Sequence, residues 1–165
     1  MTSEDAAWFA GFFDGEGSIS LLILRGRTYK KGSTLRKEKN PNSLEIRVYI
    51  QISNQCREPL ERYKKEFGGY LGEHSNGRVK AFYKWGLAGR DRVKKFLQAI
   101  QPYLVIKLPQ CILALEACSL QTGRGSHKKT TAVSDDPGRV VYYSGTELSR
   151  FIELRAMIQA LNANS

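Results

Sequence analysis

Two carboxylates separated by a single glycine are the strongest candidates for chemistry in this sequence. Asp14 and Glu16 lie in the run Asp14-Gly15-Glu16-Gly17, directly after a helix-forming segment and directly before an apolar, strand-forming one. Carboxylate and backbone carbonyl oxygens are ligands that hard divalent cations prefer. Asp-Gly and Glu-Gly are also ordinary residues for a helix cap or a hairpin turn. These four residues alone therefore leave a metal site and a plain turn as competing interpretations.

The segment before this run predicts a helix over about residues 4–15 that would position the carboxylates. Ser3 is suited to cap its N-terminus. Gly15 can adopt the left-handed conformation that ends a helix, which would place Glu16 just past the tip. Small and aromatic residues recur at i, i+3 and i+4 spacing and predict one apolar helix face: Ala6, Phe9, Ala10 and Phe13.

The cysteine and histidine counts exclude several other chemistries. The three cysteines have no C-x-x-C spacing, which argues against a disulfide framework or a zinc knuckle. Two histidines are too few for a histidine metal cage or for most histidine-dependent nucleophilic triads. A site of carboxylates and water is the hydrolytic chemistry that remains, and it suits Mg²⁺.

The charge balance indicates an anionic partner. The 165 residues contain 26 Lys and Arg against 16 Asp and Glu, a net charge of +10, and the sequence pI is about 9.7. Such a balance favours a polyanion or an anionic membrane surface. No apolar run approaches the roughly 20 residues of a membrane span, and the acidic N-terminus is unlike a signal peptide. We expect one intracellular, soluble domain over residues 1–165, with no membrane partner.

Hydrophobic periodicity predicts an α+β fold in the order helix, strand, strand, helix, strand, strand, helices. Residues 44–53 alternate strictly between apolar and polar side chains, which is typical of a half-buried strand. Residues 18–24 form its expected partner. The basic hairpin loop between them, about residues 25–43, carries seven Lys and Arg against Glu38 alone.

The second half of the chain repeats the pattern of helix and hairpin. A helix is expected over about residues 59–67, and strands 70–75 and 78–87 should meet at Asn76-Gly77, a strong hairpin signal. Three further helices, at about 91–101, 109–120 and 146–162, each have an apolar stripe that should pack on the sheet. Residues 121–145 form a long polar connection.

The polar face of the predicted sheet is a candidate DNA interface. A two-stranded ribbon fits the major groove, where Arg and Gln can pair with guanine and adenine while loop cations neutralise phosphates. The alternative interpretation is an ordinary solvated face. The candidate DNA-binding residues are Arg25, Arg27, Lys30, Lys31, Arg47, Tyr49, Gln51, Arg78, Lys80 and Lys84.

The full run Phe9-Ala10-Gly11-Phe12-Phe13-Asp14-Gly15-Glu16-Gly17-Ser18 resembles the signature of the LAGLIDADG homing endonucleases, and in particular that of single-motif members acting as homodimers. The resemblance implies an αββαββα fold with extra C-terminal helices, over about residues 109–162, and an antiparallel sheet that forms a saddle on DNA. It also implies that the signature helix packs against its twin. The expected dimer-interface residues are Phe9, Ala10, Gly11, Phe13 and Asp14.

The same resemblance implies a set of site residues. Glu16 falls on the family's metal-binding acid, where many members have Asp, and the Gly15 carbonyl falls on a backbone metal ligand. The segment 100–107 resembles a family segment that ends in an active-site lysine, here Lys107. Asn54 and Arg57 fall where related enzymes organise water or contact the scissile phosphate.

The function implied is site-specific cleavage of double-stranded DNA with Mg²⁺, for which Mn²⁺ or Ca²⁺ could substitute structurally. A homodimer implies a pseudo-palindromic target of about two helical turns, cut to leave 3′ overhangs of about four nucleotides. An intron-encoded, free-standing enzyme of intron homing would act in the cytoplasm or nucleoid of a prokaryote, or in an organelle.

Two alternatives of other classes stay open. The first is a non-cleaving protein of the same fold, either an RNA maturase that binds its own intron RNA or a DNA-binding regulator. The second is a basic structural or RNA-associated protein without catalysis. The presence of Glu16 argues against loss of cleavage.

Overall fold

The computed structural model of the chain describes residues 1–25, 44–75, 81–121 and 144–163. The elements follow the predicted α+β order, with boundaries within a few residues of those expected. They are α1 (Ser3–Glu16), β1 (Gly17–Arg25), β2 (Leu44–Asn54), α2 (Glu58–Phe67), β3 (Tyr70–His74), β4 (Phe82–Ala88), α3 (Arg90–Ile100), the 3₁₀ turn η1 (Gln101–Tyr103), α4 (Leu108–Leu120) and α5 (Gly145–Ala163).

The first helix, α1, begins with a capping box one residue earlier than predicted. The Thr2 hydroxyl accepts the Asp5 backbone N–H at 3.2 Å, and the Asp5 carboxylate accepts the Thr2 backbone N–H at 3.0 Å. Thr2, rather than Ser3, is therefore the N-cap, because only Thr2 has an acidic residue three positions later that can close the box.

The C-terminal end of α1 also differs from the prediction. The helix continues through Glu16, and Gly17 caps it in an extended conformation at φ −83°. The expectation that Gly15 is left-handed is wrong, since positive φ occurs within the described ranges only at Gly68, Gly69 and Gly89. The chain enters β1 directly from the helix, so no left-handed turn is needed.

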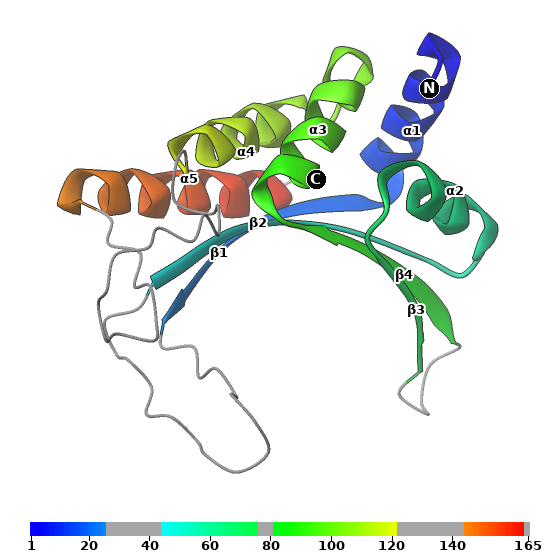
Figure 1. The fold of residues 1–165 in the computed structure, drawn as a ribbon, viewed down its shortest axis with the longest axis horizontal. Helices are drawn as coiled ribbons and strands as arrows, with labels where there is room; N and C mark the ends of the chain where they lie inside the picture. Colours follow the sequence, from blue (N-terminus) through cyan, green and yellow to red (C-terminus); the bar gives the residue numbers. More distant parts are fainter. Residues whose placement is uncertain (26–43, 76–80, 122–143, 164–165) are drawn as a thin grey trace, which may run out of the picture.

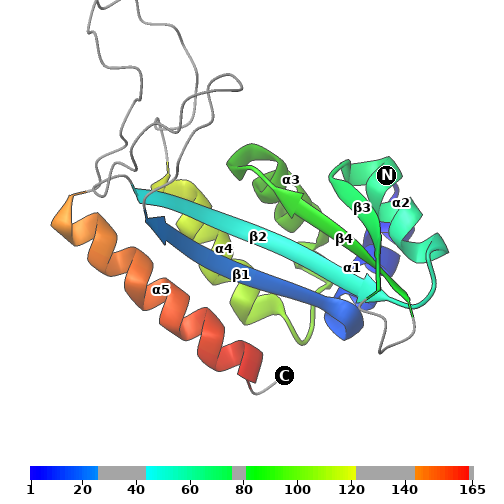
Figure 2. The same ribbon diagram turned by 90° about the horizontal axis from the view of Figure 1, so that it is seen from below.

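Four antiparallel strands form a sheet in the order β1-β2-β4-β3. Ile19 pairs with Ile50 and Gln51 pairs with Gly86, which fixes the register of the central strands. Paired residues share a face, so the apolar side chains of β2 all lie on one side and its polar ones on the other. The described helices lie over the convex side, and the concave side carries none of them (Figures 1 and 2).

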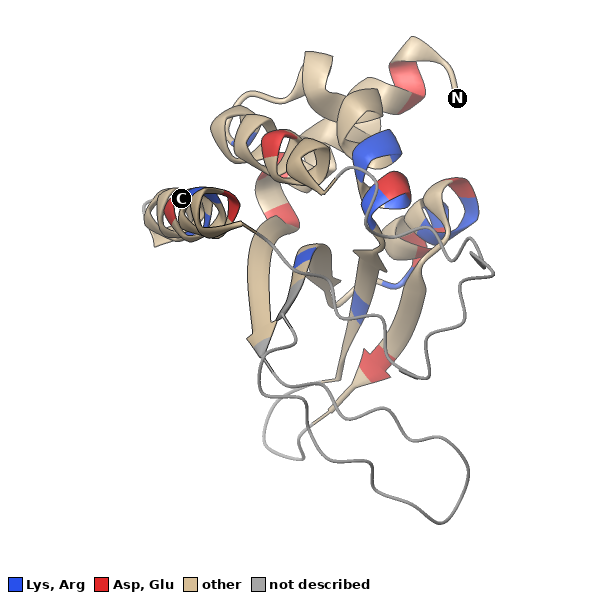
Figure 3. Cartoon of the chain, turned by 60° about the vertical axis from the view of Figure 1, so that its left-hand side comes forward, with Lys and Arg blue, Asp and Glu red and all other residues tan. Residues whose placement is uncertain are grey.

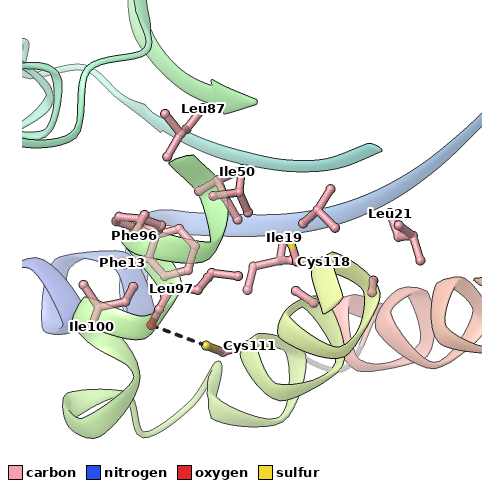
Figure 4. Close-up of a cluster of buried hydrophobic side chains, with 14 of the residues drawn as sticks. Phe13, Ile19, Leu21, Ile50, Leu87, Phe96, Leu97, Ile100, Cys111 and Cys118 are labelled. Atoms are coloured by element: carbon pink, nitrogen blue, oxygen red, sulfur yellow. Dashed lines mark hydrogen bonds between the residues drawn. The ribbon is translucent and has the colours of Figure 1, made fainter. Parts of the chain in front are cut away.

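The core lies between the convex side of the sheet and the helices (Figure 4). Phe13 of α1 contacts Phe96 of α3 edge-on, with ring centroids 5.4 Å apart. Cys111 and Cys118 of α4 are buried, as their helical spacing predicts, and the Cys111 thiol lies 3.9 Å from the Leu97 carbonyl oxygen. Across the described ranges, none of the helices combines the length and apolar character needed to cross a membrane.

The last helix, α5, flanks the edge strand β1 (Figure 2). The Asn162 side-chain amide donates to the Ile19 carbonyl oxygen at 2.9 Å, and this bond attaches the end of α5 to the sheet. On the outer side of the helical layer, the Arg150 guanidinium joins α5 to α4 through Glu116, at 2.7 Å. The predicted C-terminal helices therefore extend the layer that covers the convex side.

Candidate active site and nucleic-acid interface

Glu16 presents an exposed carboxylate at the end of α1. It is the last residue of the helix, and Gly17 pairs with Ile52, so Glu16 lies beside the end of β2. The C-terminal end of a helix carries partial negative charge and attracts cations. In the described part of the chain the Glu16 side chain has no hydrogen-bond or ion-pair partner. Its carboxylate is therefore available to a ligand.

Asp14 has the opposite surroundings. Its carboxylate is buried and accepts three backbone N–H groups, those of Val105 (2.7 Å), Ile106 (3.2 Å) and Lys107 (2.8 Å). The predicted dimer contact by Asp14 is therefore wrong for its side chain. This acid instead anchors the segment before α4 to the end of α1.

Lys107 completes a reciprocal clamp with Asp14. Its side chain is only 7 % exposed, and its ammonium group donates to the Asp14 backbone carbonyl. Lys107 is therefore a buried, hydrogen-bonded lysine rather than an ordinary solvated one. The clamp places the Lys107 ammonium group beside the last turn of α1, the helix that ends in Glu16.

Asn54 and Arg57 lie at the C-terminal end of β2 and just after it. Asn54 is the last residue of β2, and its side-chain oxygen accepts the Cys56 backbone N–H at 2.7 Å. Its amide nitrogen is then the group that could orient water. Arg57 is exposed, pairs with Glu61 at 2.8 Å, and lies 5.7 Å from the centroid of the Tyr83 ring.

The donor set at the end of α1 fits a hard divalent cation only in part. The Glu16 carboxylate and the helix-end carbonyl of Gly15 are suitable oxygen ligands. The carbonyls of Phe13 and Asp14 are already occupied, by the Gly17 N–H and the Lys107 ammonium respectively. No group of three His, Cys, Asp or Glu residues gathers within the described ranges. A complete coordination sphere would therefore need oxygens from outside one chain.

The outward face of α1 differs from the predicted dimer interface. Phe9, Ala10 and Phe13 are buried in the chain's own core, so their assignment to a dimer interface is wrong. The aromatic side chains of the opposite, inner face, Phe9 and Phe13, pack against the other helices and the sheet. The exposed residues at four-residue spacing are instead Ala7, Gly11 and Gly15. This small-residue spacing is visible in the sequence and could have identified the face.

Gly11 lies on the exposed face and stays a candidate for the dimer interface. An added Cβ at Gly11 or Gly15 would meet no atom within 4 Å. Two residues close to the Asp14 clamp extend the exposed surface, because Val105 is 81 % exposed and Ile106 is 57 % exposed. The outward side of the clamp is therefore apolar, and neither residue was among the predicted interface residues.

The concave face of the sheet carries the predicted polar residues that can be placed. The register puts Arg47, Tyr49 and Gln51 of β2 on this face with Lys84 of β4, which lies opposite Ser53. Basic segments occur on both the strands and the helices, with acidic ones between them (Figure 3). The other predicted DNA-binding residues lie outside the described part: Arg27, Lys30, Lys31, Arg78, Lys80 and the side chain of Arg25.

Three aromatic residues on this face, Tyr70, His74 and Phe82, were not among the predicted DNA-binding residues. Tyr70 in β3 shares the concave face with Tyr49, and the rings of His74 and Phe82 stack there with centroids 5.7 Å apart. Only the pairing of β3 with β4 reveals this arrangement, since β3 is too short for a clear alternation of its own.

The fold is that of the LAGLIDADG homing endonucleases. Solved structures of this class match the chain over nearly its whole length, which confirms the resemblance of the signature at the level of fold. No family model matches the chain.

Three solved structures illustrate the similarity. The homing endonuclease I-CvuI, in complex with the I-CreI target and magnesium, has a TM-score of 0.64 and 19% identity, covering 96% of this chain and 82% of that one. The archaeal intron-encoded I-Vdi141I, complexed with DNA, has a TM-score of 0.65 and 18% identity, covering 96% and 84%. I-GzeII, in complex with its DNA target, has a TM-score of 0.61 and 19% identity, covering 92% of this chain and 43% of that chain.

Proposed function

We propose that this chain is a site-specific endonuclease that hydrolyses both strands of DNA as a homodimer, with Mg²⁺ as its metal. The observation that carries the proposal is the place of Glu16, an exposed carboxylate where the concave sheet meets the exposed small-residue face of α1. The DNA in the three similar structures supports a duplex as the partner.

The duplex would lie along the concave face. There the polar ribbon would enter the major groove, with Arg47 and Gln51 able to pair with base edges. Lys84, Arg25 at the end of β1 and the other predicted basic residues, Arg27, Lys30, Lys31, Arg78 and Lys80, would neutralise phosphates. Such a division between positioning and base contacts is usual in protein–DNA complexes.

A second copy of the chain would pack on the exposed face of α1. Cleavage of both strands needs two sites, and each chain supplies one Glu16. Small residues at Ala7, Gly11 and Gly15 allow two helix backbones to approach closely, because no side chain stands between them. Val105 and Ile106 would then be covered as well, which removes exposed apolar surface from water.

Glu16 and the Gly15 carbonyl would hold the divalent metal, with the remaining ligands supplied by the scissile phosphates and the partner chain. When bound, the metal activates water and stabilises the charge of an in-line displacement. Two Glu16 carboxylates brought together repel each other, and this repulsion raises the affinity of the paired site for a cation. Mn²⁺ or Ca²⁺ could occupy the same oxygen ligands.

Lys107 and Asn54 would act beside the metal. The Asp14 clamp holds the Lys107 ammonium at the helix end, where a fixed positive charge offsets negative charge that develops on the phosphate. The Asn54 amide nitrogen is placed to orient the attacking water. Arg57 would contact the phosphate only after leaving Glu61, so we assign it a weaker role.

The setting proposed is intron homing by an intron-encoded enzyme inside a prokaryotic cell or an organelle. The expected products are 5′-phosphate ends and short 3′ overhangs. A pseudo-palindromic target follows from the two-fold symmetry of the proposed dimer.

The Glu16→Gln variant tests the proposal. Wild type and variant are incubated with a library of candidate duplexes in magnesium, and the ends produced are sequenced. We expect recurrent double-strand ends from the wild type, and at least about a hundredfold slower cleavage by Glu16→Gln with retained binding. Glu4→Gln, at the exposed start of the same helix, is the matched control and should cut normally.

Two results would contradict the proposal. Unchanged cleavage by Glu16→Gln would exclude Glu16 as the metal ligand. Tight and selective DNA binding by the wild type without any cleavage would instead favour a regulator of this fold.

A further inference from the structure

Two tyrosines lie over two glycines on the concave face of the sheet. Tyr70 in β3 pairs with Gly86 in β4, and Tyr49 in β2 lies on the same face, diagonally across from Gly86. Gly72 follows Tyr70 by two positions and also belongs to this face. The four residues therefore occupy one side of three adjacent strands.

The glycines provide space for the phenol rings. A Cβ added at Gly86 would lie 3.0 Å from Tyr49 Cζ and closer still to its hydroxyl oxygen. A Cβ added at Gly72 would lie 2.8 Å from Tyr70 Cε1 and closer to the hydroxyl end of the ring. Neither glycine has a positive φ. The close approach of the rings, rather than the backbone conformation, is therefore what requires glycine at these positions.

Both phenol groups are available to a ligand. Tyr70 is 60 % exposed and Tyr49 is half-buried. Neither hydroxyl has a hydrogen-bond partner in the part of the chain that the structure describes. Each can therefore donate and accept a hydrogen bond, and each ring offers an apolar edge.

The place of the two phenols on the concave face suits contact with base edges. The major groove presents acceptors, donors and the thymine methyl group, in patterns that distinguish all four base pairs. Tyrosine hydroxyls also bind phosphates, but Tyr49 lies on the same face of β2 as Arg47 and Gln51, the residues assigned to base edges, and Tyr70 lies on that face too. The site thus favours discrimination over general affinity.

We infer that Tyr49 and Tyr70, held over Gly86 and Gly72, form an uncharged reading surface that selects base pairs within each half-site. The occupant is the major groove of double-stranded DNA, so the inference rests on the proposed function. Tyr49 and Tyr70 contact bases directly. Gly86 and Gly72 are positioning residues, because a methyl group at either would displace the ring above it without removing it.

Binding selection tests this inference without requiring catalysis. A library of random duplexes is captured by the protein in calcium, and the bound DNA is sequenced. The variants are Tyr49→Phe and Tyr70→Phe, which remove only a hydroxyl, and Gly72→Ala and Gly86→Ala, which displace a ring. The control is Tyr103→Phe, since Tyr103 is 39 % exposed in η1, within the helical layer.

We expect each hydroxyl deletion to relax base preference about two- to tenfold at a few adjacent positions of each half-site, as for the loss of one hydrogen bond. Each glycine variant should relax the same positions as the tyrosine it displaces. The Tyr103 control should select the wild-type sequence. If Gly86→Ala fails to fold, the Tyr49→Phe result still decides the question for that pair.

Three further outcomes separate this inference from the proposed function. Unchanged selection in both tyrosine variants would overturn the reading surface and leave the endonuclease proposal standing. Selection that changes as expected, in a wild type that cuts no DNA, would support the reading surface and refute the endonuclease. A wild type that selects no sequence would refute both.

Discussion

At the scale of single residues, Asp14 and Glu16 have different roles because of helix geometry. Two residues apart on an α-helix, side chains project about 200° from each other. Asp14 therefore faces the chain's own segment 105–107, while Glu16 is exposed at the junction with the sheet. The sequence places both acids in one motif but does not show which of them faces inward.

Replacing Asp14 by Asn should destabilise the fold by about 2–4 kcal/mol. The buried carboxylate accepts three backbone N–H groups, whereas an amide would turn an NH₂ donor toward some of them. Urea unfolding measures the change. Asp91→Asn is the control, because Asp91 is 76 % exposed, and it should shift stability by less than about 0.5 kcal/mol. Equal effects of the two variants would show that the clamp contributes nothing.

The three cysteines should differ sharply in reactivity. Burial raises the pKa of the Cys111 thiol to about 12 and that of Cys118 to about 11, so neither forms the reactive thiolate at pH 8. Cys56 is exposed. Iodoacetamide at pH 8 should therefore add one group to the native protein and three to the unfolded protein, as counted by intact mass. Rapid addition of more than one group to the folded chain would contradict the buried positions.

At the scale of elements, Gly17 at the end of α1 and Gly11 within it have opposite roles. Gly17 lets the chain pass from helix to strand against Phe13, since an added Cβ would lie 2.6 Å from the Phe13 carbonyl oxygen and closer to its ring. That ring is fully buried against Phe96 and cannot move aside. Gly11 has open space above it. Gly17 is therefore required by the packing inside the chain, whereas Gly11 leaves the exposed surface of the helix without a side chain.

This contrast predicts opposite stability changes for one substitution. Gly17→Ala should destabilise the chain by about 1–3 kcal/mol through overpacking. Gly11→Ala should stabilise the isolated chain by about 0.5–1 kcal/mol, because alanine is the better helix residue. Urea unfolding at low protein concentration checks both. Gly11→Ala should also weaken dimerisation on DNA, as measured by sedimentation of the protein–DNA complex. An unchanged dimerisation constant would exclude this face as the interface.

At the scale of the whole molecule, the sheet separates two kinds of basic residue. Lys84 lies on the concave face, whereas Lys95 is exposed on α3, in the layer over the convex face. Only a cation facing the duplex should release counterions when DNA binds. The net charge of +10 by itself does not distinguish the two sides.

Salt dependence of DNA binding should therefore tell the faces apart. Lys84→Ala should reduce the slope of log affinity against log salt by about one, and Lys95→Ala should leave it unchanged. Fluorescence anisotropy with a labelled duplex at several salt concentrations measures both slopes. An equal reduction by the two variants would show that DNA does not lie along the concave face.

Local patterns in the sequence were enough to predict most elements. The strict alternation of residues 44–53 specified a strand and its two faces. The i, i+3, i+4 spacing of Ala6, Phe9, Ala10 and Phe13 predicted one apolar face of α1, although not that this face lies in the chain's own core. The signature run, residues 9–18, indicated the fold class. These features depend on residues only a few positions apart in the chain, so they can be recognised from the sequence alone.

The arrangement of the site depended on tertiary structure. Asp14 meets Lys107 across 93 positions, and Tyr70 joins Tyr49 on one face only through the pairing of β3 with β4. The exposed side of α1 likewise follows from what packs on its other side. Sequence spacing determines which side chains share a face, but packing between distant segments decides which faces are buried and which side chains meet.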